Sequence, residues 1–254
     1  MNGAFYIGAT GLQSQQHALE VVANNVANIN TPAFKRSQVR FSELVTVPAT
    51  DADGIGPRQA STLDGVRADA GDKIFSQGDL KQTGASTDLA IDGDGFLELV
   101  GANGESVLWR GGTLTQTSDG FLAGANGLPL KAMIAVPADA QSVQIDRDGL
   151  VHAVISGQTD RPEIGHLELV RVKDPAALTA LGDSLYTAAP TDLLTDAPGD
   201  AGAGALVQGS LEAANVDLSQ EMVSLLLMQR AYSANAQVVQ AGDQLMAIAN
   251  GLRR

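Results

Sequence analysis

Two long amphipathic patterns lie at opposite ends of the chain. Near the N-terminus apolar residues recur every seven positions, while polar residues such as Gln13, Gln16 and Glu20 occupy the other faces. The apolar positions are Phe5, Leu12, Leu19 and Val26, with Val22 and Ile29 beside them. This period predicts a helix with a coiled-coil-type seam. Pro32 disfavours helical geometry at Thr31, so the helix is expected to end near 28–31.

The C-terminal segment repeats the same seven-residue spacing. Asp217 and Ser219 precede Glu221, an arrangement that suits the first turn of a helix. Each predicted helix carries an apolar stripe that needs a partner, either the other helix of the same chain or another copy. The C-terminal apolar positions are Leu218, Leu225, Tyr232, Val239 and Met246, flanked by Met222 and Met228.

The middle of the chain has a different pattern, in which short apolar alternations are separated by dipeptides such as Asp92-Gly93 and Asn126-Gly127. Such dipeptides permit positive φ and are typical of hairpin turns. The pattern predicts an antiparallel β-domain. Its expected strand segments are 89–91, 96–100, 107–109, 132–136, 143–145, 150–155 and 167–172.

Polar, glycine-rich stretches on either side of this region read as extended connectors. The predicted fold class is therefore α+β, with terminal helices forming a coiled coil around a central antiparallel β-domain. The expected division is a terminal helical assembly domain at 1–45 and 211–254, connectors at 46–85 and 183–210, and the β-domain at 86–182.

Composition excludes several classes of protein. The chain has 254 residues, enough for a sizeable core, but aromatic residues are only 4% of it, which disfavours an aromatic-lined enzyme pocket. The net charge of -13 argues against nucleic acid and anionic membrane partners, because both need clustered cations. Lys35, Arg36 and Arg40 form the densest basic group, which is expected on a solvated turn.

Further absences narrow the class. The chain has no cysteine, which excludes disulfides and thiolate chemistry. Lys35 is the first basic side chain, and no apolar run approaches the roughly 18 residues of a membrane span. The expectation is a protein without a cleaved signal peptide and without direct membrane insertion.

Candidate chemical motifs favour structural interpretations. The run Asp92-Gly93-Asp94-Gly95 resembles a calcium loop, but Asn103 stands where the chelating glutamate is required, so a turn is expected. The histidines His17, His152 and His166 lack the spacing of zinc ligands. We therefore predict no catalytic residue, no cofactor and no metal site, and we expect the protein not to be an enzyme.

Two features leave their interpretation open or local. The tetrapeptide at 101–104 recurs at 124–127 and predicts two similar hairpin turns. Four asparagines in the helix patterns either fix helix register through hydrogen bonds or cap the helices and face solvent. They are Asn24, Asn25, Asn28 and Asn235.

Several stretches resemble one protein family. YIGATGL at 6–12 and ANNVANINTPAFKR at 23–36 are similar to the N-terminal signature of bacterial flagellar rod and hook proteins. At Ala33 this family usually has glycine, so the turn after the first helix is expected to differ. Further similar stretches are QGDL at 77–80, DLAIDGDGF at 88–96, GDSLY at 182–186, GSLEAANVD at 209–217, EMV at 221–223 and QRAY at 229–232.

The resemblance implies a mechanical role. Length and the 46–72 segment are most similar to distal-rod members, with proximal-rod and hook members as alternatives. It implies a helical homopolymer in the basal body, in contact with other rod proteins, the hook protein and surrounding rings, and export through the type III apparatus. The twelve seam positions named above, six in each helix with Met228 left out, are then the expected assembly interface. A secreted β-domain adhesin or hydrolase is the alternative from another class.

Overall fold

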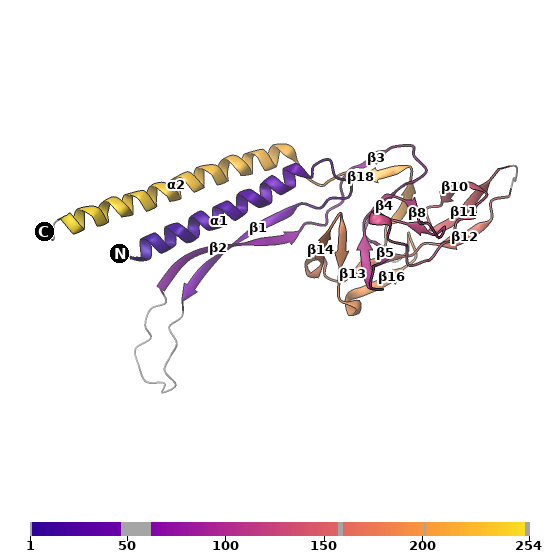
Figure 1. Ribbon diagram of the computed structural model, residues 1–254, viewed down its shortest axis with the longest axis horizontal. Helices are drawn as coiled ribbons and strands as arrows, with labels where there is room; N and C mark the ends of the chain where they lie inside the picture. The colour runs from indigo at the N-terminus through magenta and orange to yellow at the C-terminus, as the bar shows by residue number, and fades with distance from the viewer. Residues whose placement is uncertain (1, 47–61, 157–159, 201, 252–254) are drawn as a thin grey trace, which may run out of the picture. The chain divides into compact units, whose positions relative to one another are not determined.

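The computed structural model describes residues 2–46, 62–156, 160–200 and 202–251 (Figure 1). Its two α-helices and many antiparallel strands make the fold α+β, as the sequence predicted. The helices are α1 (Asn2–Ala27) and α2 (Leu218–Gly251). Neither of these described helices has a stretch of the length and apolarity that crossing a membrane requires.

The chain divides into two compact units. One contains Met1–Ala27, Ser37–Asp72 and Asp217–Arg254, and we call it the helical unit; the other contains Asn28–Arg36 and Lys73–Val216, and we call it the β-unit.

Local structure agrees with the predicted end of the first helix and with the predicted start of the second. Helix α1 stops at Ala27, and the chain then turns through a hydrogen bond from Thr31 N to Asn28 O. Asp217 caps α2, because its Oδ1 accepts hydrogen bonds from Ser219 N at 2.8 Å and Gln220 N at 3.2 Å. Residues next to each helix in the sequence therefore fix the end of α1 and the start of α2.

In the helical unit α1 and α2 lie side by side and antiparallel (Figure 1). Strands β1 (Ser37–Thr46) and β2 (Thr62–Lys73) pair with each other beside α1. Two contacts fasten α1 to them. Ser14 Oγ donates to Val66 O at 2.9 Å, and the Asn25 amide both donates to Ser37 O and accepts from Ser37 N at 2.9 Å.

The β-unit is built from small antiparallel sheets. A four-stranded sheet runs in the order β14 (Thr179–Gly182), β15 (Leu185–Thr187), β6 (Ser106–Trp109), β5 (Leu97–Val100). Two three-stranded sheets run β17 (Ala205–Gln208), β4 (Asp88–Asp92), β7 (Gly111–Thr113), and β10 (Ala140–Ile145), β11 (Leu150–Ile155), β12 (Glu163–His166). The remaining pairs are β13 (Leu169–Val172) with β16 (Leu193–Asp196), β18 (Ser210–Glu212) with β3 (Leu80–Gln82), and β8 (Thr115–Gln116) with β9 (Leu122–Ala123).

One apolar core joins most of these sheets, and Trp109 is one of its members. Residues 112 and 124 are glycines because the indole ring lies against them: a Cβ at Gly124 would lie 2.7 Å from Trp109 Cε3. A second cluster joins Phe75, Phe96 and Tyr186, whose rings meet edge to face at centroid distances of 5.1 to 5.9 Å.

The strands extend beyond the expected β-domain of 86–182. The stretch expected as a connector at 46–85 contains β2 and β3, and its residues 47–61 lie outside the described residues. The stretch 183–210 contains β15, β16 and β17. The physical reason is long-range pairing: β17 adds to the sheet of β4, with Ala205 opposite Asp92. Short polar segments become strands when a distant edge supplies hydrogen bonds.

One expected strand is absent from the described residues at 132–136. Met133 there has φ of +48°, and the segment makes only an isolated bridge, between Ala135 and Phe121. A non-glycine residue with positive φ interrupts the extended backbone. Most other expected strand segments coincide with strands: 89–91 with β4, 107–109 with β6, and 150–155 with β11.

Ala33, the residue that departs from the family's usual glycine, keeps a left-handed conformation with φ of +55°. Its amide N–H donates to Glu212 O at 2.8 Å, and its side chain is buried. The turn geometry is therefore one that favours glycine, and the surrounding contacts hold alanine in it.

Candidate functional site

Glycines of α1 lie directly against α2. A Cβ built on Gly8 would lie 2.6 Å from Val239 Cγ2, and one on Gly11 would lie 2.9 Å from Asn235 Nδ2. On α2, a Cβ on Gly242 would lie 3.4 Å from Phe5 Cε2. Small residues therefore let the helix backbones come together, and Phe5 and Val239 lie at this contact.

The residues predicted for the seam are divided between this contact and the surface. Val22 is buried, whereas Leu218, Met222 and Tyr232 are exposed by 46%, 43% and 41%. The half-buried members are Phe5, Leu12, Leu19, Val26, Ile29, Leu225, Val239 and Met246. The predicted seam did not include the small or polar residues that α1 buries, which are Gly8, Gly11, Ser14, Ala18 and Asn25.

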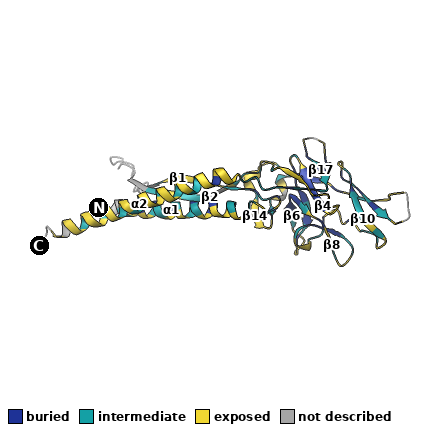
Figure 2. Ribbon diagram, turned by 90° about the horizontal axis from the view of Figure 1, so that it is seen from above, coloured by how far each residue is buried: buried dark blue, intermediate teal, exposed yellow. Residues whose placement is uncertain are grey.

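Much of helix α2 is exposed (Figure 2), and nine of its described exposed side chains are large and apolar. In its 34 residues only Glu221, Arg230 and Asp243 carry charge. We call its exposed large side chains the α2 apolar surface; besides Leu218, Met222 and Tyr232, they are Val223, Leu226, Leu227, Val238, Leu245 and Ile248.

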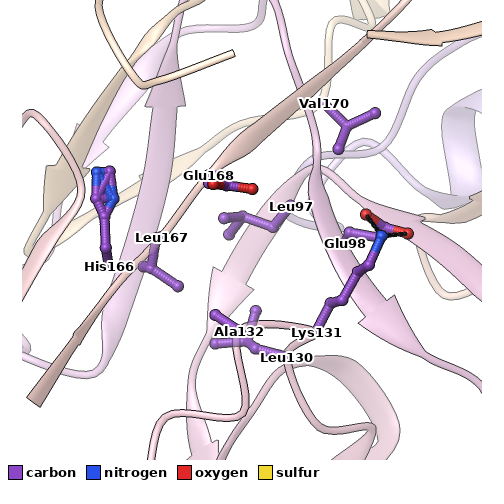
Figure 3. A pocket seen from close by; sticks show the side chains of 9 residues that line it. All are labelled: Leu97, Glu98, Leu130, Lys131, Ala132, His166, Leu167, Glu168 and Val170. Atoms are coloured by element: carbon purple, nitrogen blue, oxygen red, sulfur yellow. Dashed lines mark hydrogen bonds and ion pairs between the residues drawn. The ribbon is translucent and has the colours of Figure 1, made fainter. Parts of the chain in front are cut away.

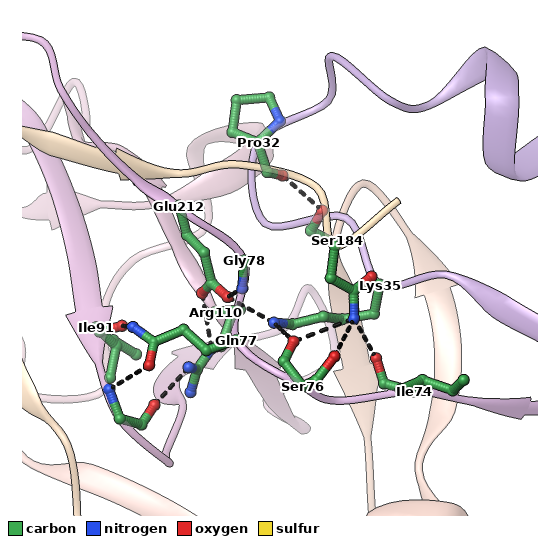
Figure 4. Close-up of polar contacts among 12 residues, drawn as sticks. Pro32, Lys35, Ile74, Ser76, Gln77, Gly78, Ile91, Arg110, Ser184 and Glu212 are labelled. Carbon is green, nitrogen blue, oxygen red and sulfur yellow. Dashed lines mark hydrogen bonds and ion pairs between the residues drawn. The ribbon is translucent and has the colours of Figure 1, made fainter. Parts of the chain in front are cut away.

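Within the β-unit, a buried charge cluster joins distant parts of the chain (Figure 4). Lys35 Nζ donates to Glu212 Oε1 at 2.6 Å and to Ser76 O at 2.8 Å. Arg110 Nε donates to Glu212 Oε2 at 2.9 Å. Gly78 N donates to Glu212 Oε1 at 2.9 Å. Glu212 thus compensates two buried cations and binds one backbone amide.

Arg110 also fixes the Asp92–Gly95 turn. Its guanidinium donates to Gly95 O at 2.5 Å and to Gly93 O. Gly93 has φ of +111° and Gly95 has φ of +138°, so this run forms the turn that the sequence predicted. The carbonyl oxygens of Gly93 and Gly95 therefore accept hydrogen bonds from the Arg110 guanidinium.

Burial changes the acid–base behaviour of two cluster groups. Desolvation lowers the pKa of Lys35, and the nearby Glu212 carboxylate opposes that change. Desolvation, with Glu212 second, raises the pKa of Tyr186 to about 12. The same burial places the hydrogen bonds of Lys35 in a low-dielectric surrounding, where they are stronger than at the surface.

The structure corrects the prediction for Lys35. The basic group at 35–40 was expected on a solvated turn, yet the Lys35 side chain is fully buried. The reason is its partner, which lies 177 positions away and gives no local signal. Arg40 is exposed, as expected, and pairs with Asp72 at 2.7 Å, but it lies in strand β1 and not on a turn.

The asparagines left open by the sequence take different roles. Asn25 binds the backbone of Ser37, so it attaches a strand to α1. Asn28 Oδ1 accepts from Thr31 Oγ1 at 3.1 Å in the turn after the helix. Asn235 lies at the helix contact beside Gly11.

A cavity of about 280 Å³ in the β-unit is lined by Glu98, Glu168 and His166, residue types that can act as acids or bases in enzymes (Figure 3). Its Glu98 is held by Lys131 Nζ at 2.8 Å and by Ser106 Oγ at 2.5 Å. Lys131 is 63% exposed. The Glu98 side chain is only 10% exposed, so this ion pair lies at the edge of the protein surface and gives the carboxylate a structural partner.

Comparison with known families identifies the class. Residues 5–35 match the family described as "Flagella basal body rod protein", and residues 90–153 match "Flagellar hook protein FlgE/F/G D1 domain". Residues 207–252 match "Flagellar basal body rod FlgEFG protein C-terminal". The chain belongs to the family of flagellar basal-body rod proteins. This confirms the family that the sequence motifs indicated.

Individual relatives match along nearly their full length. The flagellar basal-body rod protein FlgG of Agrobacterium fabrum is 35% identical over 96% of this chain and 97% of its own. FlgG of Borreliella burgdorferi is 32% identical over 100% of both chains. The flagellar basal-body rod protein FlgF of Caulobacter vibrioides is 31% identical over 94% of this chain and 93% of its own.

Proposed function

We propose that the protein is a structural subunit of the distal rod, which polymerises helically into the shaft that transmits motor torque to the hook. The relatives named FlgG, which match over nearly the whole chain, support this assignment. A family of rod proteins also supports a role as a structural subunit and not as an enzyme.

The observation that carries the mechanism is the α2 apolar surface. Leu227 is 59% exposed and Ile248 is 61% exposed, on a helix with few charges. A helix that is apolar on several faces is expected to be buried on several faces. Each large side chain that becomes buried contributes about 1.5 to 3 kcal/mol, so many copies together form a stiff contact.

In the proposed polymer the helical units form a coiled-coil inner tube, and the β-units form the outer layer. The twelve predicted seam residues then act either between α1 and α2 or between neighbouring subunits. Val239 and Phe5 serve the first role, and Leu218, Met222 and Tyr232 the second. Other rod proteins, the hook protein and the surrounding rings are the proposed partners, and the type III apparatus the proposed export route.

A proximal-rod subunit is the second candidate. The FlgF relative of Caulobacter vibrioides is 31% identical to this chain over 94% of its length. FlgG of the same organism is 33% identical over 98% of this chain, so the two identities differ little. The two positions differ in where along the rod the subunit lies. Location is therefore the measurement that separates them.

The experiment is electron cryo-microscopy of hook-basal bodies from cells that carry a short tag at Asn103. This residue is exposed in the turn between β5 and β6, so the tag does not disturb the core. Label on the rod next to the hook is expected. Label confined to the base of the rod assigns the proximal position. Absence of label from the particle, with the tagged protein exported, contradicts a rod subunit and restores the secreted adhesin.

A further inference from the structure

A cleft of about 480 Å³ in the β-unit concentrates positive charge. Four cations line it, Lys73, Arg110, Arg171 and Lys173, against the single lining carboxylate of Asp94. Glu212 and Asp196, which lie outside the lining, pair with Arg110 and Arg171, so the excess positive charge of the cleft comes from Lys73 and Lys173. The chain as a whole has 16 basic and 29 acidic residues, so this local excess is opposite in sign to the net charge. Such a site attracts a carboxylate.

The cations differ in how far they are already engaged. Arg171 Nε pairs with Asp196 Oδ2 at 2.6 Å, and Arg110 pairs with Glu212. Lys173 is exposed, and its Nζ donates to the carbonyl oxygen of Thr191 at 3.2 Å. Phe96 and Leu194 supply apolar lining next to these cations. The cleft therefore fits a carboxylate with an apolar side chain close to it.

The β14–β15 turn of the chain offers this combination. Leu181 is 54% exposed, and Asp183 is exposed two positions later. Asp183 and Ser184 hold positive φ values of +49° and +58°, a costly conformation that fixes the turn. Ser184 Oγ donates to Pro32 O at 3.1 Å, and Asp183 Oδ2 accepts from Asn126 Nδ2 at 2.8 Å. The turn is preorganised for contact.

Leu194, which is 41% exposed, lines the cleft itself, so Asp79 and Leu80 are the next candidate among the described residues of the β-unit. Leu80 is less exposed, at 36%, and Lys81 follows it directly. That lysine would repel the cations of the cleft. Met133, although 51% exposed, has Lys131 two positions before it.

We propose that the cleft receives the β14–β15 turn of a second copy of this chain, with Asp183 of that copy facing Lys173 and Leu181 on the apolar lining. The contact joins two different surfaces, and repetition of such a heterologous contact builds a helical array. The inference rests on the proposed function, because it supplies a contact between outer domains of the polymer.

The test is charge exchange in cells that make only the variant chain. Lys173→Glu and Asp183→Lys are each expected to lower the number of chains per basal body about tenfold or more, because like charges then meet. The double variant restores the opposite pair and is expected to return to within about twofold of the unchanged protein. Asp119→Lys, the same charge change on another exposed turn, is the control and is expected to assemble normally.

Normal assembly of both single variants, or a double variant no better than the worse single one, overturns the inference. Thermal unfolding of the purified full-length variants checks that the β-unit still folds. If a reversal prevents folding, Lys173→Gln and Asp183→Asn replace it, and each is expected to give a smaller loss of assembly than a reversal. Absence of the unchanged tagged chain from the rod refutes the proposed function instead, so the two failures are distinguishable.

Discussion

Lys35 and Glu212 form a buried ion pair, with Nζ 2.6 Å from Oε1 and neither side chain more than 1% exposed. Arg110 binds the other carboxylate oxygen of Glu212 at 2.9 Å. One carboxylate therefore serves two cations and joins the segment after α1, strand β18 and the residue that follows β6. Lys35 lies in the family-like stretch 23–36 and Glu212 in the family-like stretch 209–217. Each of the two stretches therefore contributes a residue that holds the β-unit together.

Glu212→Gln is expected to lower the free energy of unfolding by about 3 to 5 kcal/mol, because it leaves Lys35 and Arg110 buried without their counter-charge. Urea denaturation of the β-unit signal measures the change. Asp92→Asn, which weakens the exposed pair with Arg147 in the same unit, is the matched control and is expected to cost about 1 kcal/mol or less. Equal effects of the two variants would show that burial of the cluster contributes nothing.

Tyr186 predicts a loss of stability at high pH. Its pKa is raised to about 12 by burial and by Glu212, whereas an unfolded tyrosine titrates near 10. Between these values the unfolded chain has released the proton and the folded chain has kept it, so stability falls as pH rises, by about 2 kcal/mol at pH 12. Melting temperatures of the unchanged protein and Tyr186→Phe from pH 9 to 12 test this. The two curves should diverge, and parallel curves would show that Tyr186 is not shifted.

Gly8→Ala is expected to reduce rod assembly, although alanine favours helix by about 1 kcal/mol. The new Cβ would lie 2.6 Å from Val239 Cγ2, so the helices must separate. Val239→Ala removes that methyl group, and the double variant should regain assembly. Swimming in soft agar and rod protein in purified basal bodies provide the measurements. Failure of the double variant to recover would locate the defect elsewhere.

Leu227→Asp is expected to abolish incorporation into the rod and to leave the β-unit folded, because Leu227 is 59% exposed in the single chain. Gln229→Asp places the same charge on an exposed position of the same helix and should assemble better. Basal bodies from both strains are compared by immunoblot. Normal rods with Leu227→Asp would contradict burial of the α2 apolar surface between subunits.

Local patterns were sufficient for the elements whose signals lie within a few residues. The seven-residue apolar repeats predicted both helices, Asp217 predicted the start of α2, and the Asp-Gly and Asn-Gly turns predicted several strands. Because helix and turn propensities act over one or two turns, a sequence expresses them directly.

The sequence by itself determined the α+β class, the terminal helices and the family. Only the tertiary structure decided that Lys35 is buried, that 205–208 completes the sheet of β4, and that the cationic cleft exists. These features join residues far apart in the chain, 177 positions in the case of Lys35 and Glu212. Their energy comes from desolvation and pairing of groups that only the folded chain brings together, so no local pattern announces them.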